Sequence, residues 1–419
     1  MSYRVVIRAH TARRDAAAAA LLASILEKMG CKTMVTCVRS HIRAVTMWKP
    51  HCIVSMVPGK SRKDLLPEAY AVYWETEGYV EDNPTNGQYF FQNPDIFNNF
   101  DLFLIWGNYF EKDLENNIPN LNKSIVKKVG CGKFDYIKFS PSLPLKKPEL
   151  RNSIGVITRF STINHHESIP AIQNMHNKST YDYVVNCCHS YFYLHKVIKE
   201  IIEQTELNIS IRPHPMEDVS IYEKKIIPSF GKNNIHRFSL DTTMEIADWL
   251  PEQRVVLGST TTSFVEAYLV GIPFINIDRL SGTEKYNAEW ASVCRKWQES
   301  AYMPESIEEC ISLIKAAETL TANSPIMEEQ INSYFNWGAD FSATYRAAEE
   351  LVKFLNGNKT HDLKGWPEWV VDSLDEVSFR RARTRNPMHV NFNYRKGYHA
   401  LPESMKHVTD AIWKKYSHK

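Results

Sequence analysis

The sequence predicts an α/β protein made of two doubly wound units that face one cleft. Short apolar runs of strand length recur in the first third of the chain, each followed by a helical or loop segment, which is typical of a parallel sheet covered on both faces. A break follows at 139–153, where Pro141, Pro144 and Pro148 accompany a basic pair, as in an interdomain linker. Because the same alternation restarts after this break, we expect two α/β domains.

The first domain is expected over 1–145. A helix is expected over Asp15–Met29, and Gly30 ends it. Its apolar stretch Ala16–Leu26 is too short to span a bilayer and follows two arginines, so we interpret it as part of a surface helix and not as a signal peptide. The cytosol is therefore the expected location. The strands expected in this domain are Tyr3–Ala9, Lys32–Val38, His51–Val57, Tyr70–Glu75 and Phe100–Gly107.

The second domain is expected over 152–345. It begins with the strand "SIGVITRF", and a helix from about His189 to Gln204 precedes the strand "LNISIRP". The runs "QRVVLGS" and "IPFINID" are strands on either side of a helix, and further helices are expected from Ser306 to about Leu355. The segment 346–419 is expected to be a helical and basic extension, without a clear core pattern after Lys359.

The composition argues against several classes of protein. The chain is 43% hydrophobic, as in packed soluble proteins, and its net charge of +2 gives no reason to expect a nucleic-acid partner. Its eight cysteines show no C-x-x-C pair, so a disulfide framework or zinc module is not indicated. The adjacent residues in "NCCHSYF" and in His165–His166 would point to opposite faces of a strand. We therefore expect no metal site.

The first candidate site is a histidine between two prolines, in "ISIRPHPMED" (Ile209–Asp218). Each proline fixes its own φ at about −65° and disfavours helical geometry in the residue before it, so the side chain of His214 is aimed in one direction. In open α/β sheets, ligands bind beyond the carboxyl ends of the strands. His214, with Arg212 and Pro215 beside it, is therefore a candidate for ligand binding, although a structural turn would use the same prolines.

The second candidate is a run of hydroxyl residues in "VVLGSTTTSFVEAYLVGIPFINID" (Val255–Asp278). This run lies where a strand ends and a helix begins, and the unpaired N–H groups and dipole of a helix start favour a phosphate. An ordinary helix cap explains the hydroxyl residues equally well. Glu266 suits either a ribose or the helix dipole. The hydroxyl residues in question are Ser259, Thr260, Thr261 and Thr262.

The third candidate is a pair of acids in "VYWETEGY" (Val72–Tyr79). Glu75 and Glu77 are two residues apart at the end of an apolar strand, so they share one face if the extended geometry continues. Two nearby carboxylates raise one pKa, and a carboxylate in a cleft is a candidate general base. A charged loop at a strand end is the alternative. The three sites together suit transfer from a nucleotide-activated donor to a hydroxyl acceptor.

These motifs resemble the three signature elements of bacterial sialyl-, polysialyl- and Kdo-type transferases: a D/E-D/E-G motif, an HP motif and a serine/threonine motif. The longer pattern is similar to that of the bacterial surface carbohydrate (capsule or O-antigen) biosynthesis protein family. Its counterparts here lie in order between Trp74 and Asp278. They are "WETEG", "FLIWGNYFEKDL", "VGCGKFD", "GVITRFSTIN", "RPHPMED" and "GSTTTSFVEAYLVGIPFINID".

The resemblance implies a GT-B glycosyltransferase of two Rossmann-type domains. In such relatives the counterpart of His214 contacts the donor phosphate, the residues matching Ser259–Thr262 bind it at the helix start, and a motif acid deprotonates the acceptor hydroxyl. The chain departs from the motif at Thr76, where the transferases have an acid, so the choice of base between Glu75 and Glu77 stays open. The expected acceptor is a glycan or a lipid-linked glycan.

The expected donor is a CMP-activated ulosonic acid such as Kdo or a sialic-type acid. No D-x-D occurs in the sequence, so the usual carboxylates for a metal–pyrophosphate complex are missing, and we expect a metal-independent enzyme without a cofactor. Two alternatives remain: a CDP-polyol phosphotransferase of teichoic-acid-like polymer synthesis, and a non-catalytic module that binds a nucleotide sugar.

The C-terminal segment 377–419 is strongly basic. It contains ten Lys and Arg against Glu403 and Asp410, a local excess of +8, with six aromatic residues interleaved. Basic segments are attracted to an anionic leaflet, and aromatic residues favour the interface. We therefore expect peripheral contact with an anionic membrane, against the alternative of a tail that is solvated or packed on the acidic remainder of the chain.

Overall fold

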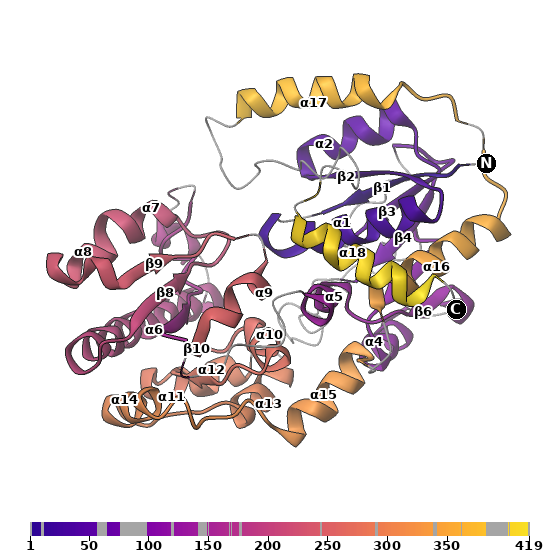
Figure 1. The fold of residues 1–419 in the computed structure, drawn as a ribbon. Helices are drawn as coiled ribbons and strands as arrows, with labels where there is room; N and C mark the ends of the chain where they lie inside the picture. Colours follow the sequence, from indigo (N-terminus) through magenta and orange to yellow (C-terminus); the bar gives the residue numbers. More distant parts are fainter. Residues whose placement is uncertain are drawn as a thin grey trace. The chain divides into compact units, whose positions relative to one another are not determined.

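The chain folds into two compact units (Figure 1). Unit 1 comprises 1–141 and 328–419, and unit 2 comprises 142–327. The computed structural model describes residues 2–9, 12–56, 65–75, 99–118, 121–140, 149, 151–166, 168, 170–175, 178–243, 245–289, 292–337, 342–361, 363–382, 401 and 403–417.

The core of unit 1 is a six-stranded parallel sheet with the order β2-β1-β3-β4-β5-β6. Five of its strands are the apolar runs expected from the sequence, and their central residues are buried, because both faces of the sheet are covered. The sixth, Val126–Lys128 at the edge of the sheet, was not expected and has no buried residue. The strands are β1 (Arg4–Arg8), β2 (Lys32–Thr36), β3 (Cys52–Ser55), β4 (Tyr70–Trp74), β5 (Leu102–Ile105) and β6 (Val126–Lys128).

The helices from the first part of unit 1 are α1 (Ala12–Lys28), α2 (Val38–Arg43), α4 (Asn108–Asn117) and α5 (Gly132–Phe139), with a short π-helix, η1 (Ala44–Trp48). The expectation of a surface helix at Ala16–Leu26 is wrong, because every residue of this stretch is buried. Its small alanine side chains allow α5 and two later helices, α16 (Ala343–Gly357) and α18 (Glu403–Tyr416), to pack closely against α1.

The core of unit 2 is a five-stranded parallel sheet with the order β11-β10-β7-β8-β9. The chain runs outward from β7 to β9, then returns to place β10 on the other side of β7. The strand order therefore reverses between β7 and β10, and such a switch point is where open α/β sheets bind ligands. The strands are β7 (Ser153–Ile157), β8 (Asn208–Arg212), β9 (Phe238–Leu240), β10 (Gln253–Gly258) and β11 (Phe274–Asn276).

Helices cover this sheet on both faces. The longest is α6 (Lys178–Gln204), which begins earlier than the sequence indicated and packs on the sheet through Leu194, Val197 and Ile201. The other helices are α7 (Val219–Ile221), α8 (Ile227–Ser229), α9 (Ile246–Trp249), α10 (Ser263–Val270), α11 (Asp278–Ser281), α12 (Glu284–Ala288), α13 (Ser292–Ser300) and α14 (Ile307–Lys315).

The chain returns to unit 1 within α15 (Pro325–Phe335), so the second compact unit ends at 327 and not at the expected 345. Contacts within unit 1 explain why the chain after 327 belongs to that unit. Phe335 packs against Trp106, with ring centroids 5.3 Å apart. The carboxylate of Asp135 accepts the backbone N–H groups of Ala343 (3.1 Å) and Thr344 (2.7 Å) and so caps the start of α16.

The segment after Lys359 has more structure than the sequence indicated. It contains α17 (Glu368–Ala382) and α18, and α18 buries Met405, Val408 and Ile412 against unit 1. Its apolar residues recur at helical spacing, a signal that the basic residues obscured. Within the described ranges, no helix is long and apolar enough to cross a membrane.

Candidate functional site

The carboxyl edge of the unit 2 sheet brings together three loops that the sequence motifs mark. They follow β7, β8 and β10, and hydrogen bonds tie them to one another. The backbone N–H of Thr158, after β7, donates to the carbonyl of Arg212, at the end of β8 (3.3 Å). A side-chain nitrogen of Arg159 donates to the carbonyl of Thr260, after β10. The loops therefore form one connected surface at the switch point.

His214 lies in a turn after β8, as the prolines on either side of it predict, and its side chain is half-buried. The backbone N–H of Met216 donates to its Nδ1 (3.2 Å), so Nδ1 acts as an acceptor. A neutral imidazole then carries its proton on Nε2, which suits donation to an oxygen of a ligand. Pro215 lies in the same turn and is also half-buried.

Glu217, to which no sequence motif assigned a role, holds this turn in place. Its side chain is only 2% exposed, and its carboxylate accepts the N–H groups of Phe160 (2.7 Å) and His214 (3.2 Å). The hydroxyl groups of Thr158 (2.9 and 3.0 Å) and Tyr222 also donate to it. Burial raises the pKa of Glu217, and these hydrogen bonds partly oppose that rise. An acid within "RPHPMED" was the available signal, but only the fold shows that it points inward.

Arg159 is a second residue that the sequence analysis left without a role. It follows β7, and its guanidinium lies over the ring of Tyr183, 5.9 Å from the centroid. Arginine stays charged in proteins and matches phosphate geometry. It lines a small pocket at the switch point, between the loops after β7 and β10 and two helices. The lining residues are Arg159, Phe160, Tyr183, Asn186, Cys187, Ser190, Ser259, Tyr286 and Asn287.

Ser259 lines the same pocket and is 6% exposed. Its hydroxyl has no hydrogen-bond partner within the part of the chain that the structure describes. A buried polar group without a partner destabilises a fold, so such groups in native proteins call for an explanation. A ligand in the pocket that accepts a hydrogen bond from Ser259 would supply one.

The other hydroxyl residues of this motif have different surroundings. Thr260 is buried, and its hydroxyl and N–H both donate to the carboxylate of Asp278 (N–H at 3.1 Å), while Asn276 donates to the same hydroxyl (3.0 Å). This hydroxyl therefore serves the fold. Thr261 and Thr262 are half-buried beside the start of α10, and the side chain of Thr262 makes no capping hydrogen bond. Glu266 is buried in the first turn of α10.

Arg212, the other predicted donor-binding cation, is buried at the end of β8. Its guanidinium makes an ion pair with Asp241, which follows β9, and donates to the hydroxyl of Thr243 (3.0 Å). Its charge is thus balanced inside the fold, and it joins the β8 and β9 loops. Arg159 is the arginine that lines the pocket at this edge.

Of the predicted acids, Glu77 lies outside the described residues, and Glu75 is buried in unit 1 at the end of β4. The carboxylate of Glu75 accepts the backbone N–H of Trp106, and the Trp106 indole N–H donates to the Glu75 carbonyl (2.7 Å). Burial raises the pKa of Glu75 well above its ordinary range, the Trp106 N–H opposes this, and Asp113 adds to it. Glu75 therefore links the ends of β4 and β5.

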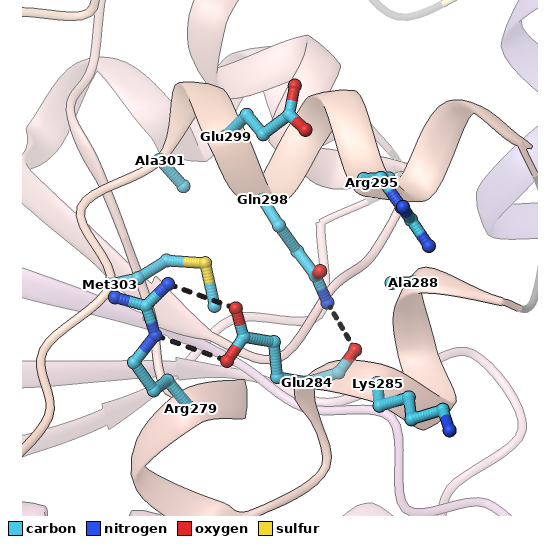
Figure 2. A pocket seen from close by; sticks show the side chains of 9 residues that line it. All are labelled: Arg279, Glu284, Lys285, Ala288, Arg295, Gln298, Glu299, Ala301 and Met303. Atoms are coloured by element: carbon cyan, nitrogen blue, oxygen red, sulfur yellow. Dashed lines mark hydrogen bonds and ion pairs between the residues drawn. The ribbon is translucent and has the colours of Figure 1, made fainter.

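A larger pocket of about 670 Å³ lies elsewhere in unit 2 (Figure 2). In it Arg279 faces Glu284 in a two-pronged ion pair (3.1 and 3.0 Å), and the Gln298 amide donates to the backbone carbonyl of Glu284 (3.0 Å). The same amide also donates to the hydroxyl of Thr260 and to the carboxylate of Asp278 (3.2 Å each). Gln298 therefore connects this pocket to the loop after β10. The lining residues are Arg279, Glu284, Lys285, Ala288, Arg295, Gln298, Glu299, Ala301 and Met303.

Groups of three or more His, Cys, Asp or Glu side chains placed to hold a metal are absent from the described ranges. The rings of His165 and His166 are adjacent, with centroids 4.4 Å apart and an interplanar angle of 33°. Nδ1 of His166 lies 3.1 Å from the carbonyl oxygen of Met216. These histidines therefore support the loop that contains His214.

Solved structures share the fold of this chain. S. aureus MnaA with UDP has 12% identity and a TM-score of 0.53, over 86% of this chain and 100% of MnaA. A putative UDP-N-acetylglucosamine 2-epimerase from Listeria monocytogenes has 12% identity and a TM-score of 0.53, over 87% and 100%. The wall teichoic acid polymerase TagF has 7% identity and a TM-score of 0.54, over 85% and 90%. The chain has a GT-B-like fold.

The predicted fold class, two Rossmann-type α/β domains of GT-B type, is therefore confirmed. No model of a protein family matches the chain, and no curated protein sequence does. The motif resemblance to surface carbohydrate proteins stays a prediction, since likeness at this level of identity shows the fold alone.

Proposed function

We propose that this protein is a bacterial surface-glycan enzyme that binds a nucleotide-activated donor in unit 2 and transfers its activated group to a glycan hydroxyl. The observation that supports this best is the pocket at the β7/β10 switch point. It combines a permanent cation, Arg159, with the buried hydroxyl of Ser259, which has no hydrogen-bond partner among the described residues. The pocket holds about 10 Å³, room for one small group, and a phosphate oxygen there would satisfy both, because it accepts hydrogen bonds and its charge complements the guanidinium.

We propose the following roles in unit 2. Arg159 and Ser259 bind a donor phosphate, and His214 donates to it through Nε2–H. Thr261 and Thr262 lie beside the site, and Glu266 is the proposed ribose contact. Buried hydrogen bonds and one ion pair hold these residues in position. The hydrogen bonds are made by Thr260 with Asp278 and by Glu217 with His214, and the ion pair joins Arg212 to Asp241. No step in this scheme uses a metal, in keeping with a sequence that lacks D-x-D.

For the general base we propose Glu77. Glu75 is buried and already accepts the N–H of Trp106, so it is poorly placed to take a proton from a large acceptor. Glu77 follows two residues later in the sequence and is the acid of the motif that remains.

The proposed donor is a CMP-activated ulosonic acid, as the motif resemblance and the lack of a D-x-D motif imply. A CDP-polyol phosphotransferase is the second candidate, and the fold shared with TagF, one structure of which was soaked with CDPG, favours it. Both reactions suit the cytoplasmic face of a membrane, where a lipid-linked acceptor is within reach. A module that only binds a nucleotide sugar is the non-catalytic alternative.

Product analysis tests this proposal. The protein would be incubated with CMP-activated ulosonic acids, CDP-glycerol, CDP-ribitol and UDP-N-acetylglucosamine, and the products identified by mass spectrometry. A glycoside without phosphorus supports the leading proposal, a phosphodiester supports the second, and epimerised sugar contradicts both. Glu77→Gln should lower turnover by about 10²–10⁴-fold and leave donor affinity unchanged. If no donor is consumed although nucleotides bind, the protein is the non-catalytic module.

A further inference from the structure

The larger pocket of unit 2, of about 670 Å³, has no part in the donor site proposed above (Figure 2). Its volume lies within the range of small-molecule sites, about 300–1,000 Å³. Lys285 and Ala288 of α12 line this pocket, whereas Tyr286 and Asn287 of the same helix line the pocket at the switch point. Helix α12 therefore lies between two separate pockets.

Among the residues that line this pocket, only Gln298 is buried, with 4% of its surface exposed. Its amide nitrogen donates to Thr260, to Asp278 and to the backbone carbonyl of Glu284. Because a carboxylate and a carbonyl can only accept, these bonds fix which end of the amide is the oxygen.

The amide oxygen of Gln298 has no hydrogen-bond partner within the part of the chain that the structure describes. Figure 2 shows this end of the side chain inside the pocket. A buried polar group without a partner calls for an explanation, and a hydroxyl group of a ligand would supply the missing donor.

Two cations lie on one side of Gln298. Arg295 of α13 and Lys285 of α12 are exposed, and neither side chain bonds to another described residue. Figure 2 shows both on the same side of Gln298, whereas Arg279 and Glu284 form their ion pair on the other side. An anion is attracted to both cations, and the guanidinium of Arg295 matches the geometry of a phosphate or carboxylate.

The rest of the lining narrows the class of ligand. Glu299 is the one acid of the lining outside the Arg279–Glu284 pair, and Figure 2 shows its carboxylate apart from the two cations. Three cations against two acids leave the lining with a net charge of +1, which favours an anion. Apolar surface for contact with carbon atoms comes from Ala288, Ala301 and Met303.

We propose that this pocket binds an acidic sugar, that is, a small molecule with several hydroxyl groups and one phosphate or carboxylate group. Arg295 and Lys285 bind the anion, and the amide oxygen of Gln298 accepts a hydrogen bond from a hydroxyl. Since Gln298 also bonds to Thr260, the sugar lies beside the loop after β10. This inference does not depend on the donor chemistry at the β7/β10 edge, so either can fail alone.

The test is calorimetry on the full chain with four probes: glucose 1-phosphate, glucuronic acid, glucose and inorganic phosphate. Wild type would be compared with Lys285→Ala/Arg295→Ala and with a matched control, Lys224→Ala/Lys225→Ala. The control removes two exposed lysines of unit 2 that do not line the pocket. All four substituted positions are exposed, so both variants should unfold at the same temperature as wild type.

We expect wild type and control to bind at least one of the two acidic sugars, glucose not measurably, and inorganic phosphate more weakly than glucose 1-phosphate. Whichever acidic sugar binds more tightly identifies the anion that the site prefers. The double variant should bind it about tenfold or more weakly, because it loses two charge-assisted contacts. Binding to wild type should weaken as salt is raised, and added CMP should leave it unchanged.

Four results would overturn the proposal. The first is that neither acidic sugar binds to wild type at millimolar concentration. The second is that glucose, or inorganic phosphate, binds as tightly as the acidic sugars. The third is that the double variant binds like the control. The fourth is that CMP displaces the sugar, which would make this pocket part of the donor site.

Discussion

The backbone N–H of His214 donates to Oε1 of Glu217 at 3.2 Å, and the same oxygen accepts the N–H of Phe160 at 2.7 Å. One buried carboxylate oxygen thus joins the turn after β8 to the loop after β7. Because Arg159 lies between Thr158 and Phe160, which both bond to Glu217, the two proposed phosphate-binding side chains, Arg159 and His214, share a single support.

Glu217→Ala should destabilise unit 2 by about 3 kcal/mol or more. It removes the acceptor of four donors, and each lost hydrogen bond costs about 1 kcal/mol, more when the donor stays buried. Urea unfolding followed by circular dichroism measures this. The control is Asp218→Ala, which removes only a bond to the N–H of Ser220 (2.9 Å). Equal losses in the two variants would mean that Glu217 is not the support we describe.

Ser259→Ala and Thr260→Val should separate ligand binding from stability. Removing the unpartnered hydroxyl of Ser259 should leave the folded protein as stable as wild type or more stable, while nucleotide affinity falls about tenfold or more. Thr260→Val breaks a bond to Asp278 and should destabilise the fold by about 1–3 kcal/mol. Thermal unfolding and calorimetry on both variants test this. A Ser259→Ala protein that loses stability and keeps its affinity would assign the hydroxyl to the fold.

Glu75→Gln should change how stability depends on pH. Because burial raises the folded-state pKa of Glu75, the folded state holds a proton that the unfolded state releases near pH 4.5. The stability contributed by this group is therefore complete below about pH 4 and is lost as the pH rises towards the folded-state pKa. Glutamine keeps an acceptor for Trp106 and cannot ionise.

The stability of Glu75→Gln relative to wild type should therefore increase from pH 5 to pH 8, by about 1.4 kcal/mol for each unit of pKa elevation titrated in that range. Melting temperatures of both proteins across this range provide the measurement. A constant difference would show that Glu75 is ionised throughout.

Much of the fold could be predicted because strands in a covered parallel sheet are apolar along their whole length. The runs at Val5–Ile7 and Val255–Leu257 are therefore visible without any partner. The return of the chain to unit 1 was not predictable, since it depends on Asp135 capping a helix that begins 208 residues later. The burial of α1 was missed for a similar reason, because two of the helices that cover it, α16 and α18, come from the opposite end of the chain.

For the candidate site, the motifs identified loops at the carboxyl edge of the sheet but not the direction of each side chain. His214 and Ser259 lie at the carboxyl edge of the sheet, as their place after strands predicts. Arg212 and Thr260 occupy equally suggestive positions, yet Asp241 and Asp278 bind them inside the fold. Those partners lie 29 and 18 residues away, so only the tertiary structure reveals them.

Calorimetry of nucleotide binding to wild type and His214→Ala tests most directly that the β7/β10 edge of unit 2 binds a donor phosphate. With CMP, CDP, UDP and GDP as ligands, we expect wild type to bind a cytidine nucleotide best. His214→Ala should bind it about tenfold to a hundredfold more weakly, which corresponds to a hydrogen bond to a charged group, while its thermal unfolding stays unchanged. His236→Ala, at an exposed position of the same unit, should bind like wild type. Absence of nucleotide binding by wild type, or equal affinities of the two variants, would contradict the account.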